Sequence, residues 1–136
     1  DLVKILGKGM PWKKHDPVLL SGLQLHLVCP HHLTVAFGSG DIAYFPDGRL
    51  ASLGRLADLM KAATSRLVLQ EEANGLVSEA LMEALQVGAA VVRIQAHHPC
   101  CSLTRPQAHA AHLTTWSGVG DLQKQRLLKS LLRDSA

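Results

Sequence analysis

Aromatic residues are scarce in this chain of 136 residues, and neither positive nor negative charge is in large excess. Aromatic side chains make up 4% of the sequence, so a hydrophobic core must be built from Leu, Val, Ala and Ile. No apolar run approaches the roughly 20 residues of a membrane span, and no signal-peptide pattern is present. The formal net charge of +3 is small for this length. We therefore expect neither a membrane nor a nucleic-acid partner.

Cysteine is also sparse, and its three copies are an odd number. In a chain without a secretory signal, thiols that bind metal in a reducing compartment are a more economical account than a disulfide framework. We accordingly expect a cytoplasmic protein. The length suits one domain with a substantial core rather than two independent domains.

The first part of the chain predicts an arm followed by two strands. Residues 1–21 are punctuated by glycine and proline, which favours a loosely structured arm or a short helix. From Gly22, apolar and polar residues alternate, as in a strand that ends at Cys29. Leu33–Tyr44 is typical of a second strand, bulged around Gly38–Gly40.

The rest of the chain predicts helices and two further strands. Apolar residues recur at helical spacing from Leu53 to Leu67, behind a Ser52 N-cap, and again from Leu76 to Leu85. Two strands are expected at Ala89–Ala96 and Leu113–Trp116, and residues 121–136 form a basic amphipathic helix that packs on its own sheet or on a neighbour's. The order β-β-α-α-β-β-α predicts an α+β fold with an antiparallel sheet, two helices on one face and a C-terminal helix.

Two short segments predict a metal site. Cys29-Pro30-His31-His32 has a Cys-x-x-His spacing, which lets a tight turn aim Cys29 and His32 at one ion. A third ligand can come from Cys100, which shares a face with His98 in an extended strand. Three protein ligands leave a fourth position for water, as in catalytic zinc sites. The alternative is that these are ordinary buried cysteines and scattered surface histidines.

These segments belong to a longer resemblance. Together with Ile42–Gly48, Leu69-Gln70-Glu71 and Ala96–Cys100, the chain from about Gly22 to Gly120 resembles the GTP cyclohydrolase I family of the tunnelling fold. The family motifs are Cys-Glu-His-His, a Gln-Glu pair that opens the second helix, and a His-x-Cys strand end. The resemblance implies a catalytic domain at residues 22–120. It also implies a homo-oligomer of pentamer or decamer type, because exposed strand edges can pair between subunits to close a barrel with sites at the interfaces.

The resemblance also implies a role for each matching residue. Cys29, His32 and Cys100 match the zinc ligands, and His31 and His98 match the catalytic histidines. Glu71 matches the carboxylate that binds the guanine ring, with Gln70 beside it as a second substrate-binding residue. Zinc lowers the pKa of its water to about 7, and a histidine can move protons near neutral pH. Without the resemblance, Glu71 is equally well explained as an acid that stabilises a helix N-terminus.

Several positions depart from the family pattern on the phosphate side. Gly54 stands where the family has a serine, Asp58 and Thr104 stand where it has arginines, and Pro30 replaces the motif glutamate. Two cations remain for substrate binding: Arg55 at the family's lysine position and Arg105 beside Thr104. A carboxylate at Asp58 would repel a triphosphate. The substrate is therefore expected to be smaller or less charged than GTP.

The sequence predicts a zinc-dependent hydrolase that acts on a guanine-like purine base or nucleoside by ring C–N hydrolysis or deamination. One alternative is an authentic GTP cyclohydrolase I, which converts GTP to dihydroneopterin triphosphate and formate. Another is a non-catalytic, zinc-stabilised oligomeric binding protein, although retention of His31 and His98 argues against it. A cytidine deaminase is disfavoured because His-x-Glu and Cys-x-x-Cys are absent from the sequence.

Overall fold

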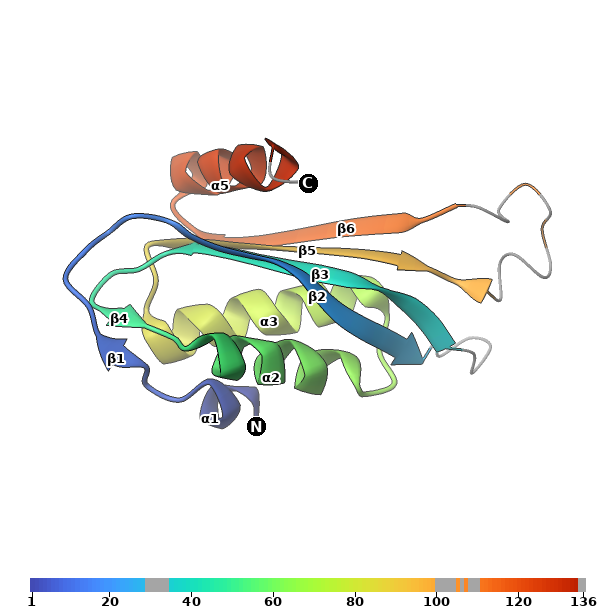
Figure 1. Ribbon diagram of the computed structural model, residues 1–136, viewed down its shortest axis with the longest axis horizontal. Helices are drawn as coiled ribbons and strands as arrows, with labels where there is room; N and C mark the ends of the chain where they lie inside the picture. The colour runs from blue at the N-terminus through green and yellow to red at the C-terminus, as the bar shows by residue number, and fades with distance from the viewer. Residues whose placement is uncertain (29–34, 100–104, 106, 108–110, 135–136) are drawn as a thin grey trace.

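A four-stranded antiparallel sheet forms the centre of the computed structural model, which describes residues 1–28, 35–99, 105, 107 and 111–134. The strands lie side by side in the order β2-β3-β5-β6. Their bounds are Val18–Val28 for β2, Val35–Phe45 for β3, Ala89–His97 for β5 and Leu113–Gly120 for β6. Strands β2 and β6 therefore lie at the two edges of the sheet (Figure 1).

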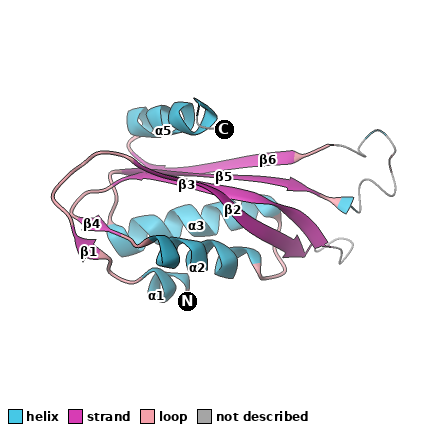
Figure 2. Cartoon of the chain, in the orientation of Figure 1, coloured by secondary structure: helices cyan, strands magenta, loops and turns pink. Residues whose placement is uncertain are grey.

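Helices cover both faces of this sheet. Helices α2 (Leu53–Thr64) and α3 (Gln70–Leu85) lie on one face, and α5 (Leu122–Asp134) lies on the other, as Figure 2 shows. The short helix α1 (Leu2–Leu6) packs against α2 and α3. Strands β1 (Met10–Pro11) and β4 (Arg49–Leu50) form a separate two-stranded sheet. The expected pair of helices on one face is confirmed, and the C-terminal helix α5 packs on the opposite face of the same sheet.

Strand alternation explains the two-sided core. In β3, Ile42 and Tyr44 pack into the cluster under α2 and α3, whereas Ala43 between them packs with Leu128 and Leu132 of α5. Successive side chains of a strand point to opposite faces, so a run that is apolar at every position is buried on both sides. The same holds for β5, whose first six residues are all buried.

Local sequence sets where the helices begin and end. The Oγ of Ser52 accepts a hydrogen bond from the backbone N–H of Arg55 at 3.3 Å, which confirms the predicted N-cap of α2. Helix α3 begins at Gln70 and carries Glu71 and Glu72 in its first turn, where the helix dipole favours negative charge. It ends at Leu85, and the C-cap Gln86 adopts a left-handed conformation with φ of 53°. No helix in the described part of the chain has both the length and the apolar character needed to span a membrane.

Strand β2 starts four residues before the predicted position, at Val18. Its pairing with β3 shifts between Leu20 and Leu23, and Gly22 in this bulge has φ of +80°. A bulge breaks the alternation of polar and apolar residues, so the pattern alone conceals the first part of the strand. The bulge expected at Gly38–Gly40 is absent, because pairing there is continuous on both sides of β3.

The N-terminal segment contains the short helix that was one of the two expectations, and it is more ordered than a loose arm. Residues 1–21 include helix α1, strand β1 and the start of β2. Leu2 and Leu6 are spaced by one helical turn, and both side chains are buried in the main core. The segment therefore contributes to the hydrophobic core and is not a loose arm.

A buried ion pair lies within the sheet, and the ring of Trp116 beside it links the sheet to α5. The Nε of Arg93 in β5 donates to Oδ2 of Asp41 in β3 at 2.7 Å, and the two residues are 6% and 3% exposed. The guanidinium carbons of Arg93 and Arg133 lie 5.3 and 5.6 Å from the ring centroid of Trp116. Cation–π contacts of this kind hold the last turn of α5 against β6.

Candidate active site

The candidate active site lies where β5 ends and α3 begins. His98 follows β5 directly, and Gln70 is the first residue of α3. The two side chains meet in a hydrogen bond of 2.8 Å between Nε2 of His98 and Oε1 of Gln70. An amide oxygen can only accept, so Nε2 of His98 donates the proton. In the neutral ring, Nδ1 then carries a lone pair, so this nitrogen can accept a proton and later release it.

The orientation of the Gln70 amide is fixed by backbone carbonyls. Its Nε2 lies 3.0 Å from the carbonyl of Ile94, 2.9 Å from that of Leu113 and 3.1 Å from Oγ1 of Thr115. Carbonyl oxygens require a donor, so the nitrogen faces the strands and the oxygen must face His98. Gln70 is 2% exposed, and its amide is engaged by the protein itself. In this structure Gln70 holds His98; its expected contact with substrate stays a prediction.

Burial and a carboxylate act in opposite directions on His98. Burial lowers the pKa of His98 below its ordinary value, because a charged imidazolium is poorly solvated there. The nearby carboxylate of Glu71 raises this pKa in part, and His97 lowers it. The net direction is downward, so the neutral ring with its free Nδ1 lone pair is favoured near neutral pH.

Glu71 presents an exposed carboxylate beside this pair. It is the second residue of α3, and its side chain is not covered by the described part of the chain. The structure therefore brings three of the predicted residues together: His98, Gln70 and Glu71. A proton-moving imidazole and a carboxylate that can accept two N–H bonds are suitable for binding and hydrolysing a guanine-like ring.

A ladder of buried polar residues that the sequence analysis missed supports Gln70. Asn74, one turn further along α3, donates to the carbonyls of Val92 at 2.9 Å and Thr115 at 3.2 Å. Thr115 donates in turn to Oδ1 of Asn74, and Ser117 bonds to Ser78 one turn beyond. Gln70, Asn74 and Ser78 follow each other at intervals of four. This polar stripe on the buried face of an otherwise apolar helix is the signal that could have identified them.

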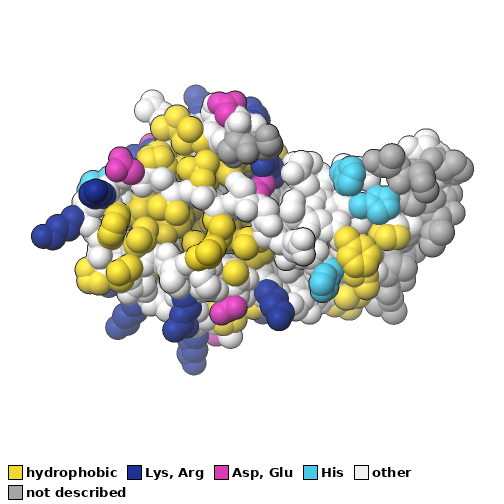
Figure 3. Space-filling model, viewed as in Figure 1, with side chains coloured by type: hydrophobic (Ala, Val, Ile, Leu, Met, Phe, Trp, Pro, Cys, Tyr) yellow, Lys and Arg dark blue, Asp and Glu magenta, His cyan; other side chains and the backbone are white. Residues whose placement is uncertain are grey.

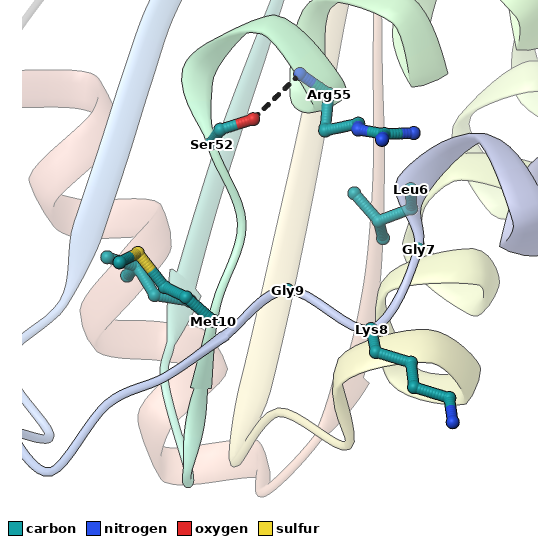
Figure 4. Close-up of a pocket in the computed structure, with 8 residues that line it drawn as sticks. Leu6, Gly7, Lys8, Gly9, Met10, Ser52 and Arg55 are labelled. Atoms are coloured by element: carbon teal, nitrogen blue, oxygen red, sulfur yellow. Dashed lines mark hydrogen bonds between the residues drawn. The ribbon is translucent and has the colours of Figure 1, made fainter.

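Arg55 lies at the opposite end of α2 from this site. Helix α2 has 12 residues and so spans about 18 Å, with Arg55 in its first turn and Gln70 beyond its last. The guanidinium of Arg55 donates to the carbonyl of Ile5 at 3.1 Å. It lines a pocket of about 330 Å³ in which Lys8 extends away from it (Figure 4). A single chain therefore does not bring Arg55 to the Gln70–His98 pair.

Thr104 lies outside the described residues, and the other phosphate-side positions that the structure describes are open to solvent. Asp58 and Arg105 are exposed, and a Cβ added at Gly54 would meet nothing within 4 Å. A serine at position 54 would therefore fit without strain. The absence of the family's serine is thus a chemical difference and not a consequence of crowding.

The predicted metal ligands Cys29, His32 and Cys100, together with His31, lie outside the described residues. The strands that lead to them can still be compared: β2 and β5 run in the same direction with β3 between them, so Val28 and His97 lie at the same end of the sheet (Figure 1). Two thiolates and an imidazole are a donor set that suits zinc. The described residues contain no group of three metal-binding side chains, and the zinc site stays a prediction.

Comparison with protein families gives one match that covers nearly the whole chain. The model of GTP cyclohydrolase I matches residues 2–135. The GTP cyclohydrolase 1 of Ralstonia nicotianae (strain ATCC BAA-1114 / GMI1000) is 32% identical over 124 residues, 91% of this chain and 59% of that protein. That of Streptococcus pyogenes serotype M49 (strain NZ131) is 36% identical over 89 residues, 65% of this chain and 46% of that protein. The chain spans about half the length of these curated relatives.

Solved structures match the fold at low sequence identity. The archaeosine synthase QueF-Like in the apo form has a TM-score of 0.67 and 17% identity, covering 81% of this chain and 99% of that one. A putative dihydroneopterin aldolase (FolB) from Vibrio cholerae has a TM-score of 0.60 and 13% identity, covering 80% and 100%. These likenesses confirm the predicted α+β tunnelling fold.

Proposed function

The chain belongs to the GTP cyclohydrolase I family, and we propose that it is a zinc-dependent hydrolase acting on a guanine-like purine base or nucleoside. The reaction is hydrolysis of a ring C–N bond or deamination. The observation that carries this proposal is the bond between His98 and Gln70 beside the exposed Glu71. These residues can bind and protonate a purine ring, whereas Asp58 and Thr104 stand at phosphate-side positions where the family has arginines.

Each residue of the pair has a distinct part in the proposed reaction. Gln70 holds the Nε2 proton of His98, which leaves Nδ1 to take a proton from water or to give one to the leaving nitrogen. Glu71 accepts hydrogen bonds from the N–H groups of the ring and so orients it. Cys29, His32 and Cys100 would hold zinc, with His31 beside them. When bound, zinc supplies water that is acidic enough to react at neutral pH.

The class of substrate is inferred from the charged residues at the phosphate-side positions. Asp58 is an exposed carboxylate at a position where the family's arginine would bind phosphate. Arg55 is held by the carbonyl of Ile5, and Arg105 is the other remaining cation. One carboxylate against two cations is a weak site for a triphosphate with its several negative charges. A base or nucleoside avoids this repulsion.

We propose that the protein is a homo-oligomer of pentamer or decamer type, with active sites between subunits. Two features support this: Arg55 and the Gln70–His98 pair lie at opposite ends of α2, and β2 and β6 are edge strands. Pairing of β6 with β2 of a neighbouring subunit would protect both edges and extend the sheet into a barrel. Light scattering at micromolar concentration is expected to give a mass several times that of one chain, and an active monomer would contradict this.

An authentic GTP cyclohydrolase I remains the second candidate, because the 32% identity to a GTP cyclohydrolase 1 extends over 91% of this chain. The two candidates differ in substrate. The zinc-loaded protein should be assayed with guanine, guanosine and GTP by the change in ring absorbance, with formate measured in parallel. We expect the uncharged compounds to react faster. Faster turnover of GTP with formate release would establish the second candidate instead.

Two controls separate catalysis from binding. His98→Ala should lower kcat by about 10²–10⁴-fold with little change in substrate affinity, because proton transfer acts in the transition state.

Metal analysis of the purified protein should find one zinc per chain, and Cys100→Ser should lose it. A protein that retains zinc and oligomeric state but turns over no purine would instead be a binding protein. The thiol ligands also agree with our expectation of a reducing, cytoplasmic location.

A further inference from the structure

Helix α5 covers only part of its face of the sheet. Its Leu128 packs with Ala43 of β3 and Val91 of β5. Further along the same strands, Ser39 and Gln95 lie on this face too, because side chains two residues apart in a strand point the same way. Figure 1 shows β5 and β6 extending well beyond α5. Gln95 is exposed, so this part of the face is in contact with solvent.

A row of polar side chains crosses the open part of the face. The sheet register places four of them side by side, one on each strand: Gln24, Ser39, Gln95 and Thr114. The Cβ atoms of directly opposed residues lie about 4.5–5.5 Å apart, so the four side chains form one continuous band. Each amide and each hydroxyl can both donate and accept a hydrogen bond, and none of the four is charged. The band can therefore bind the polar edge of a neutral ligand.

An exposed aromatic ring lies next to this band. Phe37 precedes Ser39 by two residues in β3, which places it about 7 Å away on the same face. Phe37 is 57% exposed, and its ring contacts that of His26 with the centroids 6.2 Å apart. Figure 3 shows histidine side chains gathered beside hydrophobic ones at this end of the molecule. An aromatic ring that is open to solvent is a surface on which a planar heterocycle can stack.

The aromatic ring and the polar band line one pocket. Its volume is about 380 Å³, and its described lining consists of Phe37, Gly38, Ser39, Gln95 and His112. Pockets for small molecules commonly measure about 300–1,000 Å³. None of these five residues is an acid, a lysine or an arginine, and the nearby charges of Asp41 and Arg93 neutralise each other in their ion pair. The pocket is thus suited to a neutral ring.

The amide of Gln95 indicates which kind of ring fits. A glutamine amide forms a bidentate pair with adenine, in which N7 accepts beside an N6 amino group that donates. Glu71 in the candidate active site suits a different edge, because a carboxylate accepts from two adjacent N–H groups. Guanine has such a pair of donors and adenine does not. An adenine compound therefore distinguishes this pocket from the candidate active site.

We propose that the pocket of Phe37, Ser39 and Gln95 is a second binding site, for an adenine-type ring, on the sheet face opposite α3. The ring stacks on Phe37 and pairs with Gln95, and Ser39 adds a hydrogen bond at its edge. The site lies across the sheet from Gln70 and Glu71, and it does not depend on the proposed hydrolysis. Pairing of β2 and β6 with neighbouring subunits would extend the sheet sideways and would not occupy this face.

The probe is adenosine, and the protein is the full chain loaded with zinc. Equilibrium dialysis with adenosine at up to about 1 mM should find one molecule bound per chain. Gln95→Ala should weaken binding about 5–100-fold, as expected for loss of one bidentate pair. Phe37→Leu keeps an apolar side chain without the ring and should weaken binding about 3–10-fold. Gln24→Ala is the matched control, because Gln24 is exposed in the same row but is not part of the pocket lining.

Two further variants make the outcome decisive. Gln95→Glu keeps the size of the side chain but cannot donate to N7, so it should weaken binding as Gln95→Ala does, with an unchanged circular dichroism spectrum. Glu71→Gln alters the candidate active site and should leave adenosine binding unchanged, so the test stands even if no purine is hydrolysed. The proposal is overturned if wild type binds no adenosine, if Gln95→Ala binds it as tightly as Gln24→Ala, or if Glu71→Gln abolishes binding.

Discussion

Nε2 of His98 donates a hydrogen bond to Oε1 of Gln70 at 2.8 Å, and the amide nitrogen of Gln70 donates in turn to the carbonyls of Ile94 and Leu113. The tautomer of His98 is thereby set by the backbone of two neighbouring strands. A chain of hydrogen bonds of this kind is rigid, because each group has one orientation that satisfies its partners. The imidazole that we propose to move protons is positioned by the sheet itself.

Removal of this link should reduce both catalysis and stability, and a matched variant separates the two effects. In Gln70→Leu, His98 loses its acceptor and both tautomers become populated, so we expect kcat to fall about 10–100-fold. The matched control is Asn74→Leu, which removes the next rung of the same buried ladder without touching His98. Both variants should lose about 1–3 kcal/mol in the free energy of unfolding. Nitrogen NMR of the imidazole should show mixed tautomers for Gln70→Leu, and equal losses of kcat in the two variants would contradict the positioning role.

Glu71 should be required for substrate recognition and dispensable for folding. Glu71→Gln replaces an acceptor with a group that also donates, which leaves one N–H of the ring facing another donor. We expect a loss of about 2–4 kcal/mol in kcat/KM with zinc content unchanged. Glu72→Gln is the control, since Glu72 is an equally exposed acid in the same helical turn. If Glu72→Gln lowers kcat/KM as much, the effect comes from the helix N-terminus and not from contact with the ring.

Local patterns are sufficient to predict most helices and strands, but not the face of the sheet on which each helix packs. Helix α2 begins at the predicted cap Ser52 because capping depends on residues within one turn. The position of α5 depends on contacts of Leu128 and Leu132 with Ala43, which is far away in the sequence. Hydrophobic spacing shows which side of a helix is buried, but not against which face of a sheet. The observed start of β2 differs from the predicted one for a local reason, the bulge at Gly22.

In the candidate site, too, the residues can be predicted from local motifs, whereas the contacts between them cannot. Gln70, Glu71 and His98 were identified from motifs that lie at fixed places in the chain. The bonds that orient Gln70 depend on the register of β5 with β6, which no local pattern specifies. The position of Gln95 beside Ser39 likewise follows from strand register. The distance of Arg55 from the site follows from the length and direction of α2, and a linear motif does not contain this information.

The buried pair of Asp41 and Arg93 should be costly to break from one side. Asp41→Ala leaves the Arg93 cation buried without its carboxylate, and we expect a loss of about 3–5 kcal/mol. The double variant Asp41→Ala with Arg93→Met removes both charges and should regain part of this loss. Urea unfolding monitored by circular dichroism measures the stability of both variants. A double variant as unstable as the sum of the two single variants would show that the pair has no coupling.

Tyr44 should make stability depend on pH in the alkaline range. Burial raises the pKa of Tyr44 above its ordinary value of 10.0, against the opposing effect of its bond from the Ala51 N–H. The folded state thus holds the phenol proton more tightly than the unfolded state. The contribution is fully present below pH 10, the unfolded pKa, and is lost as the pH rises through the higher folded pKa.

Tyr44→Phe is the corresponding test. At pH 8 the variant should be less stable than wild type by about 1–3 kcal/mol, because the buried Ala51 N–H loses its acceptor. Wild type should then lose stability faster than the variant above pH 10, so the difference narrows. The sequence contains one tyrosine, so tyrosinate absorbance reports on Tyr44 alone. Titration of folded wild type at the same pH as the unfolded chain would contradict the raised pKa.

Restoring a cation at position 58 should shift the substrate preference toward GTP. Asp58→Arg removes a repulsive carboxylate and adds a group that pairs with phosphate, and the exposed position accommodates the longer side chain. We expect the affinity for GTP to rise about tenfold, or about 1.4 kcal/mol, with turnover of guanine and guanosine unchanged. Asp58→Asn removes the repulsion alone and should give a smaller rise. Both effects should shrink at high salt, because exposed charges are screened. If neither variant changes the ratio of GTP to guanosine turnover, position 58 does not face the phosphates, and the smaller-substrate proposal loses its main support.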